Sequence, residues 1–165
     1  MKKILIMTIK DAISEIENFM RYQMGTYLYR FEFMEDELSQ SFDYRFSSRF
    51  NDDYSLIEYS NGYYLGNVIE GQKGGFGVYV WKNYSSIDSI YMGEWWNDKR
   101  EGLAFSLHDT FCYHGEFLDG KYHGKGHYIN SKGLDFEAYF DNGNISRLIC
   151  SNYDFTFNGR NFSAR

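Results

Sequence analysis

The chain of 165 residues contains no proline, only two cysteines and no apolar run long enough to cross a bilayer. A membrane-spanning helix needs about 20 consecutive apolar residues. The absence of proline disfavours a Pro-rich spacer between separate parts. Cys112 and Cys150 are too few for a disulfide framework, so we interpret them as reduced thiols and expect a cytoplasmic protein.

Basic residues are also scarce. The chain has 17 Lys and Arg against 23 Asp and Glu, which gives a formal net charge of −6. Neither residues 1–61 nor residues 62–165 carry a basic excess. Nucleic acids and anionic lipids both attract positive surfaces, so this charge disfavours them. We therefore expect a protein partner and no nucleic acid, with a membrane lipid as a disfavoured alternative.

Motifs for catalysis or metal binding are missing as well. The sequence has no Gly-x-Ser-x-Gly, no phosphate-binding Gly-x4-Gly-Lys-Ser/Thr and no His-Glu-x-x-His. His123 and His127 have a spacing found among zinc ligands. On a strand, however, residues four apart lie about 13 Å from each other, too far to share one ion. We predict no enzyme activity, no metal and no cofactor.

Aromatic residues and glycines, in contrast, recur in a fixed order. Three copies begin at Tyr64, Tyr91 and Tyr113, at intervals of 27 and 22 residues. Positions 1, 3 and 5 of each copy read aromatic, glycine, and aromatic or branched, and this alternation predicts a strand. A polar stretch follows, with glycine at position 8 in two copies, which is typical of a tight turn. Asp98 replaces that glycine in the second copy, and we expect it to keep the turn because Asp tolerates left-handed geometry.

Glycines also occupy positions 12 and 14, on the predicted return strand. Glycine is costly inside a strand, so its repeated use predicts close backbone approach or room for a large ring from a neighbouring repeat. We therefore predict structural roles for the glycines at the signature positions: Gly66, Gly75, Gly77, Gly93, Gly102, Gly115, Gly124 and Gly126.

This pattern resembles the MORN repeat (membrane occupation and recognition nexus) over about residues 63–145. The first and third copies match at every signature position, whereas the second departs at Asp98, Ala104 and Phe105-Ser106. A shorter fourth copy at residues 136–143 is predicted to cap the array. The resemblance implies a mainly β fold, an antiparallel single-layer sheet of stacked hairpins, which binds a protein segment along its groove.

The first 62 residues precede the recognisable repeats. Residues 8–24 predict an amphipathic helix, because apolar side chains recur there every three or four residues. Residues 27–33, 42–46 and 54–59 are strand candidates, and Asn61-Gly62 is a candidate hairpin turn.

The predicted organisation is one cooperative domain in three parts. Residues 1–62 supply the helix and diverged strands that cap the array. Residues 63–145 form the repeats, and residues 146–165 supply C-terminal capping strands.

Two sets of residues are candidates for partner contact. Tyr91, Trp95, Tyr113 and Phe117 lie in the central repeats, and aromatic anchors dominate interface energetics; the alternative is that they are pure core. Position 6 carries Ile69, Trp96 and Leu118, a line of apolar groups on a face expected to be wet. Either the N-terminal helix or a partner covers this line, and the sequence leaves both possibilities open.

Three functions fit these features. A non-enzymatic scaffold or adaptor is the preferred one. A small inhibitor, such as an immunity protein that neutralises a toxin, fits the acidic N-terminal region. A peripheral membrane-lipid binder is the third, with the net charge against it.

Overall fold

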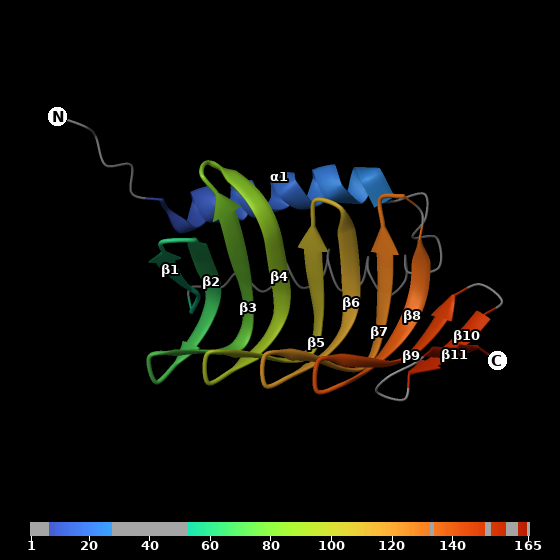
Figure 1. Ribbon diagram of the computed structural model, residues 1–165. Coiled ribbons are helices and arrows are strands. Elements are labelled where there is room, and N and C mark those ends of the chain that lie inside the picture. The colour runs from blue at the N-terminus through green and yellow to red at the C-terminus, as the bar shows by residue number, and fades with distance from the viewer. Residues whose placement is uncertain (1–6, 28–52, 133, 151–152, 158–161, 165) are drawn as a thin grey trace.

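The computed structural model describes residues 7–27, 53–132, 134–150, 153–157 and 162–164. One helix, α1 (Ile9–Tyr27), precedes an eleven-stranded sheet whose strands are antiparallel and follow one another in sequence order (Figure 1). The strands are β1 (Ser55–Tyr59), β2 (Gly62–Ile69), β3 (Gln72–Asn83), β4 (Ser86–Trp96), β5 (Lys99–His108), β6 (Phe111–Leu118), β7 (Lys121–Asn130), β8 (Asp135–Asp141), β9 (Asn144–Cys150), β10 (Tyr153–Phe157) and β11 (Phe162–Ala164). The predicted mainly β fold with one N-terminal helix is confirmed.

Helix α1 begins with a reciprocal cap. The Asp11 amide donates to Thr8 Oγ1 at 3.1 Å, and the Thr8 amide donates to the Asp11 carboxylate at 3.0 Å. These bonds satisfy amides that have no partner inside the helix. The helix extends to Tyr27, three residues past the predicted end at residue 24, and it includes Gly25. One glycine costs a helix only about 1 kcal/mol, which its other contacts can offset.

The strand candidates before the repeats have different outcomes. Strand β1 confirms the candidate at residues 54–59. The hairpin turn that follows is Ser60-Asn61, one residue earlier than predicted, because Gly62 pairs with Tyr59 as the first residue of β2. Apart from Tyr27, which belongs to α1, the candidates at 27–33 and 42–46 lie outside the described residues.

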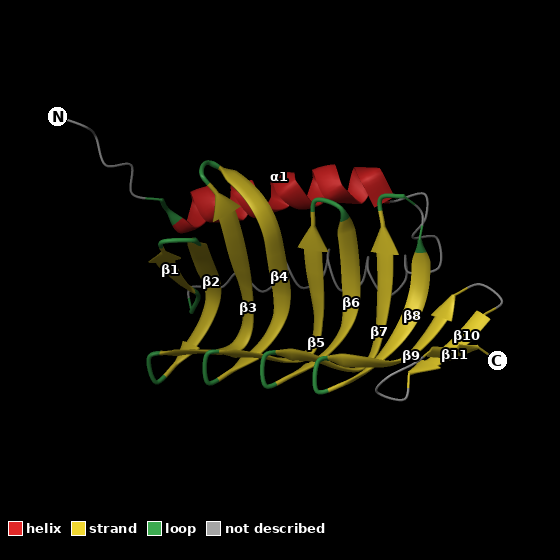
Figure 2. Ribbon diagram, viewed as in Figure 1, coloured by secondary structure: helices red, strands yellow, loops and turns green. Residues whose placement is uncertain are grey.

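Each repeat is a hairpin whose two strands are joined by a two-residue turn, and these turns all lie at one end of the sheet (Figure 2). Both residues of each turn have positive φ, as a type I′ turn requires: Glu70-Gly71, Asn97-Asp98, Asp119-Gly120 and Asn142-Gly143. Asp98 has φ 64°, so it keeps the turn without glycine. Successive turns also bond to one another, since the Asp98 amide donates to the Lys73 carbonyl at 3.0 Å and the Gly120 amide to that of Arg100.

A row of small residues crosses the sheet from β2 to β8. Strand pairing aligns Gly66, Gly77, Gly93, Ala104, Gly115, Gly126 and Ala138. The register shifts directly after this row on β2, β4 and β6, and the strands bend there (Figure 1). A Cβ at Gly77 would overlap the ring of Tyr64, and one at Gly126 would overlap the ring of Tyr113. Glycine at these two positions therefore leaves the space that each tyrosine ring fills.

Helix α1 packs on one face of the sheet. Ala12, Ile16 and Met20 are buried there against residues of β2 to β7 that include Leu65 and Ile90. Its position is fixed by a polar contact as well. Glu15 accepts a hydrogen bond from the Tyr63 hydroxyl at 3.2 Å and pairs with Lys82 Nζ at 3.0 Å. The helix therefore closes one face and leaves the other face of the sheet to the rings of the repeats.

Candidate functional site

A layer of aromatic side chains fills the bend on the face opposite α1. Six rings in it are each at most 8% exposed: Tyr64, Tyr79, Tyr91, Trp95, Tyr113 and Phe117. They meet mostly edge to face; the Tyr91 ring lies 5.0 Å from that of Trp95 and 5.1 Å from that of Phe117. Such pairs add about 0.5–1.5 kcal/mol beyond the area they bury. We call this set the aromatic layer.

The four central residues expected to contact a partner all belong to this layer. Tyr91 is 0%, Trp95 5%, Tyr113 2% and Phe117 2% exposed. Such low exposure agrees with the alternative interpretation, in which these four residues belong only to the core. Their contact with a partner stays a prediction. In the chain by itself, these four rings are buried beneath the solvent-exposed surface of the sheet.

The tyrosine hydroxyls of the layer reach back to the backbone. Tyr64 donates to the Asn67 carbonyl at 2.7 Å, and Tyr91 donates to the Glu94 carbonyl at 2.9 Å. Tyr113 occupies the same repeat position, yet its buried hydroxyl has no hydrogen-bond partner among the described residues. Burial raises the pKa of all three hydroxyls, so they remain protonated donors at neutral pH.

Tyr113→Phe and Tyr91→Phe are expected to differ in effect. Removing the Tyr91 hydroxyl leaves a buried carbonyl without its bond and should lower the free energy of unfolding by about 1 kcal/mol. Removing the Tyr113 hydroxyl breaks no bond and should leave stability unchanged or slightly raised. Urea unfolding of the two variants measures the difference. Equal losses would show that the Tyr113 hydroxyl has a partner after all.

Side chains at position 10 of the repeats cover the aromatic layer. Lys73 Nζ lies between 5.2 and 5.9 Å from the centroids of four rings, among them Tyr64 and Trp95, and pairs with the Asp98 carboxylate at 3.1 Å. One repeat later, the Arg100 guanidinium lies 5.7 Å from the Tyr91 ring and 5.1 Å from that of Phe117. These cations pack on ring faces and shield the layer from water.

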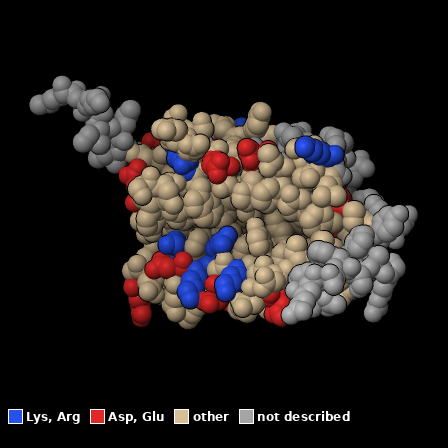
Figure 3. Space-filling model, viewed as in Figure 1, with Lys and Arg blue, Asp and Glu red and all other residues tan. Residues whose placement is uncertain are grey.

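Two stacks of rings extend the same face past the layer, and the first of them includes Tyr79 of the layer itself. The first contains Tyr59, Tyr79 and Trp81, with centroids 5.6 and 4.5 Å apart. The second contains His108, Phe111, Tyr128 and Phe136, with centroids 3.9, 5.1 and 4.6 Å apart. We call the two stacks together the aromatic face. Since α1 lies behind the strands in Figure 1, Figure 3 views this face and shows a hollowed band without charged side chains across its middle.

A gap separates the two stacks, between Trp81 and His108. Register aligns Trp81, Ser89 and His108 on β3, β4 and β5, and Ser106 lies one row closer to the bend. Ser106 occupies the position that holds Tyr79 and Tyr128 in the other repeats. The result is an open depression of about 250 Å³, which we call the serine gap, lined by Trp81, Asp88, Ser89, Arg100, Ser106, His108 and Tyr122.

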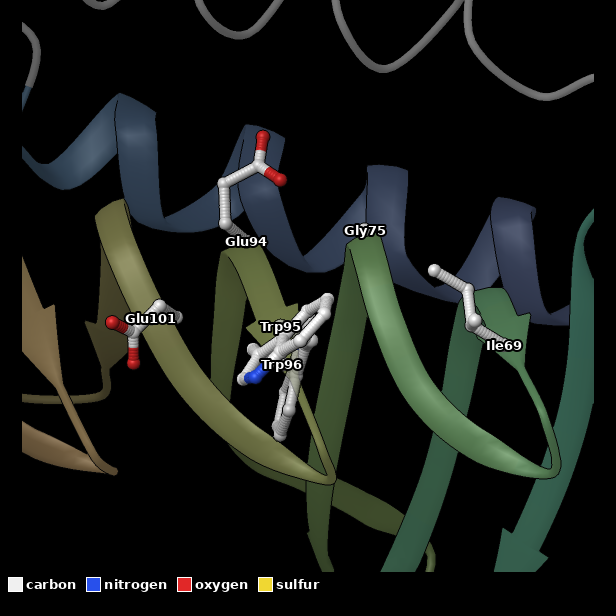
Figure 4. A pocket seen from close by; sticks show the side chains of 6 residues that line it. All are labelled: Ile69, Gly75, Glu94, Trp95, Trp96 and Glu101. Carbon is white, nitrogen blue, oxygen red and sulfur yellow. The ribbon is translucent and has the colours of Figure 1, made fainter.

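The apolar line at position 6 lies elsewhere, beside the tight turns. Ile69 is 51%, Trp96 61% and Leu118 48% exposed, so α1 does not cover this line. Ile69 and Trp96 border a second open depression, together with Glu94 and Glu101 (Figure 4). Of the partner-binding candidates, Trp96 is therefore the one with an exposed side chain.

The environments of His114, His127 and Cys112 are those of residues with a structural role. His127 pairs with Asp135, and His114 stacks on Phe105 at 4.2 Å. Burial raises the pKa of the Cys112 thiol to about 12, which keeps it in the unreactive protonated form. No three potential metal ligands cluster within the described part of the chain. In the same part, no helix combines the length and the apolar character needed to cross a membrane.

Comparison with known families agrees with this geometry. The family model of the MORN repeat matches residues 64–86, 91–104 and 113–134. No curated protein matches the chain significantly. Each matched stretch begins at a position-1 tyrosine and spans one hairpin or most of one. Residues 64–134 of the chain therefore contain three repeats of the MORN family, and such repeats are generally non-catalytic modules for interaction with proteins or membranes.

Proposed function

We propose that this chain is a non-enzymatic adaptor that binds an extended polypeptide segment across the aromatic face. The supporting observation is that every ring of the two stacks except Tyr79 is at least partly exposed and that no described element lies over them. Tyr59 is 41% exposed, and Trp81, Phe111 and Tyr128 are partly exposed. Contiguous exposed rings of this kind are typical of interaction surfaces.

The face rests on a closely packed layer, which favours affinity. The aromatic layer beneath it is packed edge to face, and Trp95 Nε1 donates to the buried Gly77 carbonyl at 3.2 Å. A preorganised surface loses little conformational entropy when a segment binds. The net charge of −6 favours a polypeptide over a nucleic acid or an anionic lipid.

Trp81→Ala tests the proposal. Partners are first captured on the immobilised chain, and the bound segment of each is mapped and purified. Because a large ring at the surface is a typical anchor, the variant should weaken binding of that segment by about 30-fold, or roughly 2 kcal/mol, in calorimetry. Tyr84→Ala is the control, since Tyr84 is 99% exposed on the loop between β3 and β4 and touches neither stack.

Two outcomes contradict this function. Unchanged binding by Trp81→Ala, with folding intact, would remove the aromatic face from the interface. Equal losses in Trp81→Ala and Tyr84→Ala would place the segment over the β3–β4 loop instead.

One observation favours a second candidate, a peripheral lipid binder. The exposed side chains of Ile69, Trp96 and Leu118 form an apolar line, and tryptophan prefers the membrane interface. Co-sedimentation with phosphatidylcholine and phosphatidylserine vesicles at physiological salt, lost in Trp96→Ala, would support that function. The inhibitor role is a narrower form of the adaptor, in which the captured partner is a toxin whose activity the chain abolishes.

A further inference from the structure

Arg100 lacks the counter-ion that its counterpart in the preceding repeat has. Lys73 pairs with the Asp98 carboxylate at 3.1 Å. Arg100 occupies the same repeat position and also packs on rings of the aromatic layer, but it forms no ion pair with any described carboxylate. Its one hydrogen bond goes from an Nη to the Gly120 carbonyl at 2.6 Å. A partly buried charge is costly unless a partner of opposite sign compensates it.

The reason for this difference is visible in the turns. The side chain at position 10 meets the second residue of the next tight turn, because successive turns stack on each other. That residue is Asp98 for Lys73 and Gly120 for Arg100. Asp98 brings a carboxylate, whereas Gly120 offers only its carbonyl. The guanidinium therefore keeps donors available, in a fork that suits a carboxylate.

Arg100 also lines the serine gap, where polar groups converge. The Ser106 hydroxyl and His108 Nε2 lie 2.9 Å apart, and the side chain of Ser106 is 2% exposed. Burial lowers the pKa of His108, so its ring is neutral at pH 7. Arg100 is then the only positive charge among the residues that line the gap.

We propose that the serine gap is a specificity subsite that takes one Asp or Glu side chain of the bound segment, whose carboxylate pairs with Arg100. This inference rests on the proposed adaptor function and adds the chemistry of one residue of the segment. The rings of Trp81 and Tyr122 flank the methylene groups of that side chain.

The charge of the gap favours a carboxylate over a phosphate. Asp88 also lines the gap, at its exposed rim. One guanidinium balances a group of charge −1. A phosphate monoester carries a charge of about −1.5 to −2 at pH 7 and would leave an excess of negative charge beside Asp88.

Peptide selection on the full-length chain tests this subsite. A phage-displayed library of random peptides supplies binders, and synthetic copies of the best ones are titrated by fluorescence anisotropy. We expect the binders to share Asp or Glu at one position. Replacing that residue by Gln or Asn, or changing Arg100→Gln in the chain, should each weaken binding by about 10- to 100-fold. The two changes together should weaken it little further, because they remove the same ion pair.

Two further variants separate the subsite from general electrostatics and from misfolding. Lys99→Gln removes the same charge from the neighbouring residue, whose ammonium group pairs with Asp119, and should leave peptide affinity within about twofold. Ser106→Tyr restores the ring that other repeats carry at this position. It should fill the gap and weaken acidic peptides about as much as Arg100→Gln, while the chain still melts cooperatively.

The outcomes distinguish this inference from the adaptor function. Peptides that bind without a shared acidic residue, or equally well to Arg100→Gln, would overturn the subsite and leave the adaptor function standing. Binding that requires phosphoserine, or Arg100-dependent binding to phosphatidylserine vesicles but to no peptide, would also overturn it. If the parent chain selects no peptide at all, both the adaptor function and the subsite fail.

Discussion

Gly126→Val is expected to lower the free energy of unfolding by about 3 kcal/mol or more. A side chain at this position would overlap the hydroxyl and the ring of Tyr113. The ring cannot move aside easily, because Phe117, Tyr122 and Phe140 surround it at centroid distances of 5.7, 4.6 and 5.8 Å. Thermal and urea unfolding of the purified variant measure the loss.

Lys125→Val is the matched control for this substitution. It places the same side chain on the same strand, one residue earlier and on the other face. Lys125 is 57% exposed in its side chain and pairs with Glu137, an ion pair whose loss costs about 1 kcal/mol at most. Similar losses in the two variants would mean that β7 tolerates valine poorly everywhere and that the packing of Tyr113 on Gly126 is not the cause.

The repeat architecture could be predicted because its signals are local. Alternation of rings and glycines marks each strand, and the two residues of each tight turn mark its end. Even the departure at Asp98 was interpretable, since Asp reaches φ 64° at low cost. The helix prediction succeeded for the same reason, except at its C-terminal end, where the helix continues through Gly25.

The roles of the two faces could not be predicted, because they depend on contacts between distant residues. The bulges after the glycine row bend the sheet, and α1 does not cover the position-6 residues beyond the bend. Trp95, which alternation places on the same face as Tyr91, is buried in the aromatic layer, whereas Trp96 on the other face is exposed. Likewise, the position of α1 is fixed by the pairing of Glu15 with Lys82, 67 residues away, which no periodicity indicates.

One sequence feature pointed to the serine gap, but its structural consequence could not be derived from the sequence alone. Ser106 was visible as a missing ring in the second repeat. Its consequence depends on the alignment of three strands, which brings Trp81 and His108 to the two sides of the gap. The unpaired state of Arg100 depends in turn on the stacking of the tight turns. Both are properties of neighbouring repeats together, and a single copy of the pattern contains neither.

Trp95→Ala is expected to have the largest effect of a single truncation, a loss of about 3–5 kcal/mol in the free energy of unfolding. Trp95 is 5% exposed, and its ring meets those of Tyr64 and Tyr91 at 5.4 and 5.0 Å. The substitution leaves a cavity in the aromatic layer. It also leaves the Gly77 carbonyl without its donor and removes one of the rings beneath Lys73.

Trp96→Ala provides the internal comparison, since the two residues are adjacent and share one strand. Trp96 is 61% exposed, so its truncation should change stability by less than about 1 kcal/mol. Chemical unfolding of both variants, with binding of a mapped partner segment measured below the unfolding transition, separates a core role from an interface role. A Trp95→Ala chain that unfolds like the parent but no longer binds the segment would show that this ring contacts the partner directly. If it unfolds like the parent and still binds, Trp95 has neither role, and the aromatic layer does not hold the repeats together.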